Sequence, residues 1–527
     1  MPELSQSTQN LIKQHLDWCL AFQSKEGSGT IHVDEVTSKV ASFYEKMRGV
    51  IDWREEHLLR KTAIERILKR RLFLKKNGQA IAEPLIYELI RGGHFPNDTI
   101  AEAKIKEIQK LIDKYVFIIE KAPSPPRERM KIQLYDWILG IAACEVEEIL
   151  SPSFKETALM DYMLEQMKEK VEAKNESEDE KNTQLYIATQ KALFKLDAPI
   201  ISYNLFKKWH PDWANLSQEK LAEITKNIYV IWEKIEKALR HPLVERFYNM
   251  AEKYDTPYLI LGDVIAQDPQ KAKENLANPE TLENKIKEVY GQRLRKVKAR
   301  MKRAAIYSTL SIFLTKILVA FAIEVPFDKY VTQEFNYSTL GLNVLIPSFL
   351  MFFLVLSIRP PSKRNAQLVI MEVMKIVYQR EKKDVYIIKP KPRRGFLLNS
   401  IIILLYLLSF VVSFGLIAWG LKELNFSLLS IIIFLMFISL ISFAGVKIRQ
   451  RAKELVVEQE KETFLLTFLD LFSLPIIQVG RWLSNQWAKY NALAVLFNSL
   501  LDMPFQVFVE FLEQWRLFLK EKREEIH

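Results

Sequence analysis

Two oppositely charged residues lie inside a stretch of the sequence that is otherwise almost wholly apolar. Lys316 and Glu324 interrupt the run SIFLTKILVAFAIEVPF, residues 311–327. An ammonium group near the middle of a membrane-spanning helix costs about 2.5–3.5 kcal/mol, so it needs water or an anionic partner. Glu324 lies about 12 Å along the helix axis from Lys316, and Asp470 is the other candidate. We expect Lys316 to form an ion pair inside the membrane with one of these two carboxylates.

The alternative for Lys316 is a place on an ion or proton pathway, because ionisable residues inside membranes often mark one. A proton relay needs a series of titratable groups, and the other long apolar stretches have no acidic residue between their ends. Their polar residues are mainly hydroxyls such as Ser409 and Ser439, which commonly serve helix packing. A structural ion pair is therefore the favoured interpretation.

The other residue types that could do chemistry do not form a catalytic or cofactor motif. The sequence has no GxxxxGK[ST], GxGxxG, HExxH or CxxC pattern, which argues against phosphate-binding loops and common zinc sites. His241 and Glu245 share a helix face, but one such pair does not make a metal site. Glu145 and Glu148 also share a face, for which solvated acids are the usual explanation. We expect no catalytic residue, no metal and no cofactor, and thus a protein that is not an enzyme.

One short segment, residues 203–235, suggests a protein partner. Two lysines and the sequence His-Pro-Asp end one expected helix there, and a second helix with apolar residues at core spacing follows. The segment resembles the middle of a J-domain, the co-chaperone module that stimulates Hsp70. The resemblance implies a loop that contacts Hsp70 and a basic docking face: His210, Pro211 and Asp212 in the loop, with Lys207 and Lys208 on the face.

The resemblance departs from the family pattern at Trp213, where a cation is usual, and the preceding helix is short. His-Pro-Asp is also an ordinary way to end a helix, because proline disfavours helix at the residue before it. A helix-ending turn is therefore the alternative to a working J-domain.

Four apolar stretches are long enough to cross a membrane as helices, which takes about 20 residues each. A soluble domain rarely needs helices that are apolar on every face, so we predict four transmembrane helices. They cover residues 304–324, 338–358, 396–421 and 428–446.

Lysine and arginine are concentrated on one side of these stretches. Residues 293–303 hold seven basic residues, and 359–395 and 447–453 are also basic, whereas each of the two opposite connections holds one lysine. Because basic flanks stay in the cytoplasm, we expect both termini to be cytoplasmic and the protein to lie in the inner membrane. The net charge of +11 then favours anionic lipid headgroups as partners, and we expect no specific nucleic acid.

The rest of the chain predicts cytoplasmic helices. Residues 60–76 carry eight cations and one acid, which we expect to face the membrane surface or solvent. The fold class is all-α: helical subdomains at 1–171 and 184–303, a flexible charged linker at 172–183, the transmembrane region at 304–446, and an amphipathic tail at 447–527, in which 464–479 and 492–512 are interfacial or re-entrant.

These features predict a non-enzymatic anchor or scaffold for protein partners at the cytoplasmic face of the membrane. A membrane-tethered J-domain-like co-chaperone of Hsp70 is the first alternative. A channel or transporter is the second, and it would need a polar path through the apolar helices.

Overall fold

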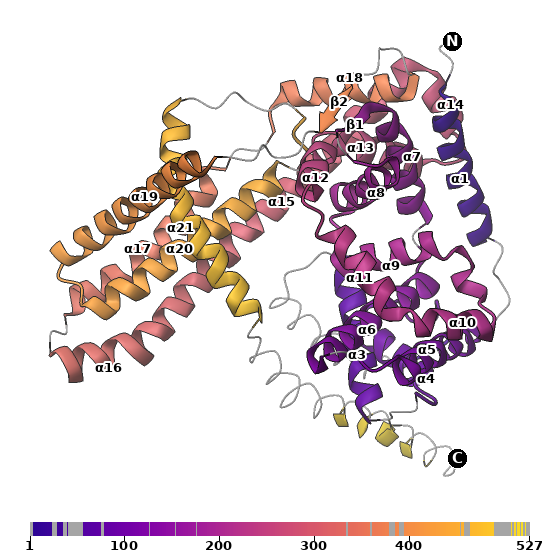
Figure 1. Cartoon of the computed structure of the whole chain (residues 1–527), viewed down its shortest axis with the longest axis horizontal. Helices are drawn as coiled ribbons and strands as arrows, with labels where there is room; N and C mark the ends of the chain where they lie inside the picture. Colours follow the sequence, from indigo (N-terminus) through magenta and orange to yellow (C-terminus); the bar gives the residue numbers. More distant parts are fainter. Residues whose placement is uncertain are drawn as a thin grey trace. The chain divides into compact units, whose positions relative to one another are not determined.

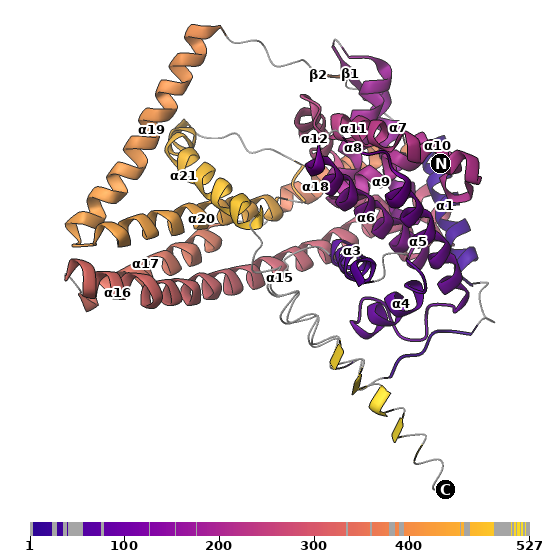
Figure 2. The same ribbon diagram turned by 60° about the horizontal axis from the view of Figure 1, so that its bottom comes forward.

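The structure is a computed structural model in which nearly every element is a helix, and this confirms the predicted all-α class. The chain forms two compact units (Figures 1 and 2). The first comprises Met1–Ala277, Val377–Pro390 and Phe497–His527, and the second Asn278–Ile376 and Lys391–Leu496. The structure describes residues 4–23, 29–34, 39, 56–74, 78–125, 127–152, 154–174, 176–333, 336–358, 361–378, 385–388, 395–453, 455–457, 464–489 and single positions between 507 and 522.

The first unit contains short and medium helices and one pair of strands. Its elements are α1 (Gln6–Gln23), α3 (Glu56–Leu74), α4 (Ala82–Arg91), α5 (Ala103–Lys121), α6 (Glu128–Leu150), α7 (Phe154–Lys170), β1 (Val171–Ala173), α8 (Glu178–Phe194), α9 (Ala198–Trp209), the 3₁₀ helix η1 (Pro211–Asn215), α10 (Gln218–Lys226), α11 (Ile228–Leu239), α12 (Val244–Glu252), α13 (Asp255–Gln267), α14 (Ala272–Ala277) and β2 (Tyr386–Ile388).

One large apolar core runs through this unit from α3 to α11. Ile64, Leu85, Ile138 and Leu205 are each almost completely buried in it. Helix α6 lies at its centre and packs against α3, α5 and α9. Residues before and after 172–183 therefore share one core, and the two predicted cytoplasmic subdomains are not separate.

The segment expected to be a flexible linker, 172–183, forms part of this fold. Residues 171–173 are strand β1, and α8 begins at Glu178 with Ser177 as its N-cap, whose hydroxyl accepts a hydrogen bond from the backbone N–H of Glu180. The charges fill the exposed first turn of α8, where acids are stabilised by the helix dipole. The high charge that suggested a linker is thus the polar start of a helix.

The strand that pairs with β1 comes from the connection between the second and third apolar helices. Strand β2 runs parallel to β1, with Val171 opposite Tyr386 and Ala173 opposite Ile388. The backbone carbonyl of Val377 accepts a hydrogen bond from the N–H of Ser5 at 3.2 Å. These contacts make residues 377–390 part of the first unit.

Among the residues that the structure describes, four helices are long and apolar enough to cross a membrane, as predicted, and all lie in the second unit. The first of them begins well before residue 304, because the basic segment and the apolar segment form one continuous helix. The elements are α15 (Pro279–Val319), the π-helical turn η2 (Ala320–Glu324), α16 (Val325–Phe327), the π-helical turn η3 (Asp328–Thr332), α17 (Tyr337–Leu356), α18 (Lys363–Tyr378, whose last two residues belong to the first unit), α19 (Phe396–Glu423), α20 (Leu428–Ala452) and α21 (Phe464–Lys489).

Helix α21 covers the 464–479 stretch of the predicted tail and packs against α19 and α20, crossing α20 obliquely (Figures 1 and 2). Pro475 has no N–H, so the carbonyl of Leu471, four residues earlier, loses its helical donor. The hydroxyl of Ser409 donates to that carbonyl at 2.7 Å, and Ser413 donates to the carbonyl of Phe472 at 2.8 Å. Ser409 thus replaces the donor that Pro475 lacks, and Ser413, one turn further along α19, bonds to the next carbonyl. Residues 492–512 lie almost entirely outside the described part of the chain.

Gly480 lets α21 approach α20, and its replacement by alanine should be destabilising. A methyl group at Gly480 would lie 1.9 Å from the carbonyl oxygen of Ser439, so we expect Gly480→Ala to cost about 1–3 kcal/mol in the free energy of unfolding. Gly415 on α19 has no neighbouring atom within 4 Å, so Gly415→Ala should be neutral or stabilising by about 0.5–1 kcal/mol. Denaturant titration of the purified variants measures both values, and equal effects would contradict this packing.

Candidate functional site

Lys316 and Glu324 meet inside the second unit. The Nζ atom of Lys316 lies 2.6 Å from Oε1 of Glu324, and the two side chains are 0% and 1% exposed. Helical side chains lean toward the N-terminus, so Glu324 points back toward the lysine from η2, the π-helical turn that follows α15. Of the two candidate partners for Lys316, Glu324 is in direct contact. The side chain of Asp470, the other candidate, lies outside the described part of the chain.

Two further helices complete the surroundings of the Glu324 carboxylate. Its Oε2 atom accepts hydrogen bonds from Nδ2 of Asn343 on α17 and, at 2.9 Å, from the hydroxyl of Ser430 on α20. The Lys316 ammonium also lies 5.1 Å from the ring centroid of Phe437 on α20. We call Lys316, Glu324, Asn343 and Ser430 the polar clamp. It connects α15, η2, α17 and α20 through one carboxylate.

The polar clamp is nearer to one end of the bundle than to its middle. Asn343 is about 9 Å from the start of α17 at 1.5 Å per residue, and Ser430 is in the first turn of α20. Both helices start at the weakly charged connections, away from the basic flanks. Among the residues that the structure describes, no third ionisable side chain contacts the Lys316–Glu324 pair. In this part of the chain, the neutral donors Asn343 and Ser430 complete the surroundings of the pair.

The His-Pro-Asp segment lies in the first unit where α9 ends and η1 begins. Pro211 and Asp212 are exposed, and His210 is half-buried against the ring of Phe206, 5.0 Å away between centroids. Burial and the nearby Lys234 lower the pKa of His210, so its imidazole is neutral at pH 7. Asp212 forms an exposed ion pair with Lys220 at 2.7 Å. The three residues form the turn between two helical elements.

The two lysines before this turn contact the unit itself. Lys207 Nζ lies 2.5 Å from a carboxylate oxygen of Glu148, which also accepts a hydrogen bond from the hydroxyl of Tyr203 at 2.6 Å. Lys208 Nζ lies 4.1 Å from the ring centroid of Tyr186. The J-domain resemblance assigns the positive charges of Lys207 and Lys208 to a docking face. Within the unit, Glu148 partly neutralises that charge, and Lys208 lies over an aromatic ring.

Trp213, the residue that departs from the J-domain pattern, anchors the turn. It is 1% exposed and packs edge-to-face on Phe206. Its indole N–H donates at 2.7 Å to Glu145, whose carboxylate also accepts from Tyr115 at 2.6 Å and from Lys114 at 2.7 Å. Glu145 is thus a buried acceptor for three donors and not a solvated acid. In the sequence, the burial of Glu145 was indicated by its position, one helical turn from apolar residues of α6.

The basic helix expected to face the membrane surface or solvent, residues 60–76, directs most of its described cations toward carboxylates of the same unit. This differs from the expectation because the acids come from three other parts of the unit: α4, α6 and the N-cap of α9. The pairs are Arg60–Glu147 at 3.6 Å, Lys61–Asp197 at 2.7 Å, Lys69–Asp136 at 2.6 Å, Arg71–Glu88 at 3.0 Å, and Arg70–Glu88.

Among these pairs, Glu147 makes the first unit sensitive to pH near neutrality. Burial, only partly offset by Arg60 and Lys61, raises the pKa of Glu147 from 4.5 to about 7. A carboxyl group with a raised pKa keeps its proton in the folded state after the unfolded chain has lost it. The free energy of unfolding should therefore fall by up to about 3 kcal/mol as the pH rises from 4.5 to 7, and change little above pH 7 through this group.

Glu147→Gln should remove this decline. We expect urea titrations of the variant to give a free energy of unfolding for the first unit that exceeds the wild-type value more at pH 8 than at pH 5. Parallel profiles of wild type and Glu147→Gln between these pH values would show that the carboxyl group titrates normally.

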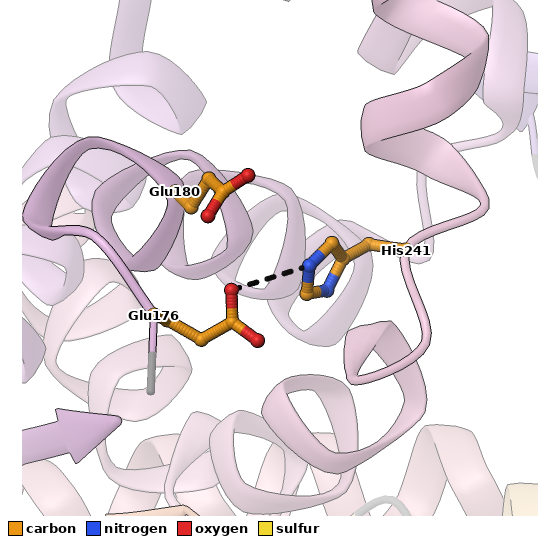
Figure 3. Close-up of side chains that lie close together, drawn as sticks. All are labelled: Glu176, Glu180 and His241. Carbon is orange, nitrogen blue, oxygen red and sulfur yellow. Dashed lines mark ion pairs between the residues drawn. The ribbon is translucent and has the colours of Figure 1, made fainter. Parts of the chain in front are cut away.

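Three potential metal ligands, Glu176, Glu180 and His241, lie close together in the first unit (Figure 3), with ligand atoms within 4.8 Å of one another. The His241 Nε2 atom is 3.5 Å from Glu176, while its Nδ1 accepts a hydrogen bond from the backbone N–H of Leu243. A neutral imidazole that accepts at Nδ1 carries its proton on Nε2, so Nε2 has no lone pair for a cation. We assign no metal to this group. Glu245, which we expected on the face of His241, instead contacts Lys191 at 3.2 Å.

A groove of about 580 Å³ lies between α6 and α11 in the first unit. Its apolar lining residues are Trp137, Trp232 and Met130. The indole N–H of Trp137 has no acceptor among the residues that the structure describes. Charged side chains of both signs also line the groove: Asp136, Glu233, Glu236, Lys237 and Arg240. This groove combines aromatic residues with charged ones, and aromatic residues are enriched where proteins bind one another.

Comparisons with known proteins give no relative for this chain: no protein family, curated protein or solved structure matches it. The J-domain resemblance therefore rests on residues 203–235 alone. The interpretation of the site depends on its geometry.

Proposed function

We propose that this protein is a non-enzymatic membrane anchor that holds its first unit at the cytoplasmic face and assembles protein partners there. The observation that carries the proposal is the insertion of residues 377–390 into the first unit through the β1–β2 pair. These residues separate the second and third apolar helices. The chain consequently passes between the two units four times, at 277/278, 376/377, 390/391 and 496/497. A unit that is joined to the apolar helices at several points of the chain suits a scaffold. A unit joined through one flexible linker would suit it less.

The same insertion supports the proposed orientation. Residues before α15 and residues 377–390 belong to one unit, and α15 and α17 are the apolar helices between them. A unit on one side of a membrane requires these two helices to cross and return. This agrees with the basic flanks, which favour the cytoplasm for that side.

The polar clamp favours an anchor over a channel or transporter. Both oxygens of Glu324 have donors from Lys316, Asn343 and Ser430. A buried carboxylate whose donors come from several helices holds those helices in one arrangement. An intramembrane pathway would need additional ionisable or hydrated groups in sequence.

The groove between α6 and α11 is the proposed binding surface for a partner. Buried aromatic residues contribute most strongly to protein interfaces, so Trp137 and Trp232 should dominate. Affinity purification from native membranes should recover a protein in stoichiometric amount with the wild type and lose it with Trp137→Ala/Trp232→Ala, while Phe154→Ala, an exposed residue of α7, leaves recovery unchanged.

Two results would contradict the anchor function. Ion flux through vesicles that contain only this protein would indicate a transporter. Stimulation of an Hsp70 ATPase that is lost with His210→Gln would indicate the co-chaperone.

A further inference from the structure

Six cations cover one face of α15 directly before its apolar half. Within the part of the chain that the structure describes, none of them contacts a carboxylate, and all are exposed. At 3.6 residues per turn they spread over roughly 200° of the helix surface, and Leu294, Val297 and Met301 occupy the rest. We call this set the cationic face: Arg295, Lys296, Lys298, Arg300, Lys302 and Arg303.

The distance of each cation from the apolar half is fixed, because α15 is one uninterrupted helix from Pro279 to Val319. Arg303 directly precedes the apolar half, and Arg295 is about 12 Å further along the axis. The headgroup layer on each side of a bilayer is roughly 5–8 Å thick, and charges act over about 8 Å in physiological salt. All six cations would therefore act on headgroups once the apolar half is in the membrane.

Two other basic segments are held at the same end of the bundle by Asn365, which is 3% exposed. Its Nδ2 donates to the hydroxyl of Tyr290 on α15 at 2.9 Å and to the carbonyl of Leu455 after α20, and its Oδ1 accepts from the N–H of Val457 at 2.8 Å. This residue connects α15, the start of α18 and the end of α20. The end of α20 adds three exposed cations: Lys447, Arg449 and Lys453.

We propose that this end of the bundle binds anionic phospholipids, with the headgroup phosphate between the cationic face of α15 and the cations at the end of α20. The proposal rests on the proposed membrane position and adds a lipid class to it. Nucleic acid would also be attracted by these charges. The face, however, continues directly into an apolar helix, where the adjoining surface is lipid, and this favours a headgroup.

The test uses the full-length protein in a neutral detergent, titrated with a fluorescent short-chain phosphatidylglycerol and, as the zwitterionic reference, phosphatidylcholine. The wild type should bind phosphatidylglycerol more tightly. Each cation contributes about fivefold, so Arg295→Gln/Lys298→Gln/Lys302→Gln should weaken phosphatidylglycerol binding about 100-fold. A control with the same charge change at exposed lysines of the first unit outside the groove, Lys226→Gln/Lys271→Gln/Lys273→Gln, should bind like the wild type.

Several outcomes would overturn the lipid site. The wild type could bind both lipids equally, or the control could lose as much affinity as the α15 variant. Competition by free glycerol phosphate as strong as by the lipid would indicate a soluble anion, and equal competition by a short RNA would indicate a nucleic-acid surface. Recovery of the protein in the membrane fraction is independent of these titrations, so a failed lipid site and a failed anchor are distinguishable.

Discussion

Lys316→Leu is expected to reduce the free energy of unfolding of the bundle by about 3–5 kcal/mol, and Glu324→Leu by a similar amount. Each single change leaves one charge buried without its ionic partner. The remaining charge stays buried and has at most neutral hydrogen-bond partners, which makes it costly. The double variant Lys316→Leu/Glu324→Leu removes both charges together, so it should be more stable than either single variant.

Denaturant titration of the purified protein in bicelles measures these values as a double-mutant cycle. Ser430→Ala supplies a milder comparison, because Glu324 keeps Lys316 and Asn343 and loses one hydrogen bond, for about 1–3 kcal/mol. Additive single and double effects would show that Lys316 and Glu324 are not coupled. Single variants with wild-type stability would show that the polar clamp does not hold the helices together.

Trp213→Ala is the second change with a large expected effect, a loss of about 3–5 kcal/mol from the first unit. The change opens a cavity beside Phe206 and removes one of the three donors to Glu145. Trp213→Phe keeps most of the ring and loses the N–H, so it should cost about 1.5–3 kcal/mol. His210→Gln should change stability by less than about 0.5 kcal/mol, because the imidazole is half-buried and lies at a turn.

The three variants can be ranked by urea unfolding, monitored by tryptophan fluorescence, or by hydrogen exchange in α9 and α10. We expect Trp213→Ala to be the least stable, Trp213→Phe to be intermediate and His210→Gln to be close to the wild type. The order reverses the importance that the J-domain resemblance assigns, since Trp213 would matter for the fold and His210 would not. If His210→Gln were as destabilising as Trp213→Ala, our account of the turn would be wrong.

The features predictable from the sequence are those that depend on neighbouring residues. The four apolar helices follow from runs of about 20 apolar residues, and the structure contains them. Glu324 was one of two candidate partners for Lys316, because it lies eight residues further along the same apolar run. Asn343 and Ser430 could not be predicted, because they come from other helices and neutral side chains give no signal of a shared carboxylate.

The features that the sequence did not predict depend on contacts between distant residues. Lys61 and Lys69 looked available for a membrane surface, but Asp197 and Asp136 pair with them across the fold. Segment 172–183 looked like a linker because the partner of β1 lies more than 200 residues away. In each case the local charge was recognised, and the distant residues that contact the segment were not.

Labelling of single cysteines tests the central claim that the four apolar helices span the membrane with their basic flanks in the cytoplasm. In a background with Cys19→Ser and Cys144→Ala, cysteine is placed at Val331, at Glu423 or at Ser362. We expect a membrane-impermeant maleimide to label Val331→Cys and Glu423→Cys in intact cells, and Ser362→Cys only after the membrane is permeabilised. Labelling of Ser362→Cys in intact cells, or recovery of the protein in soluble form without detergent, would contradict the account.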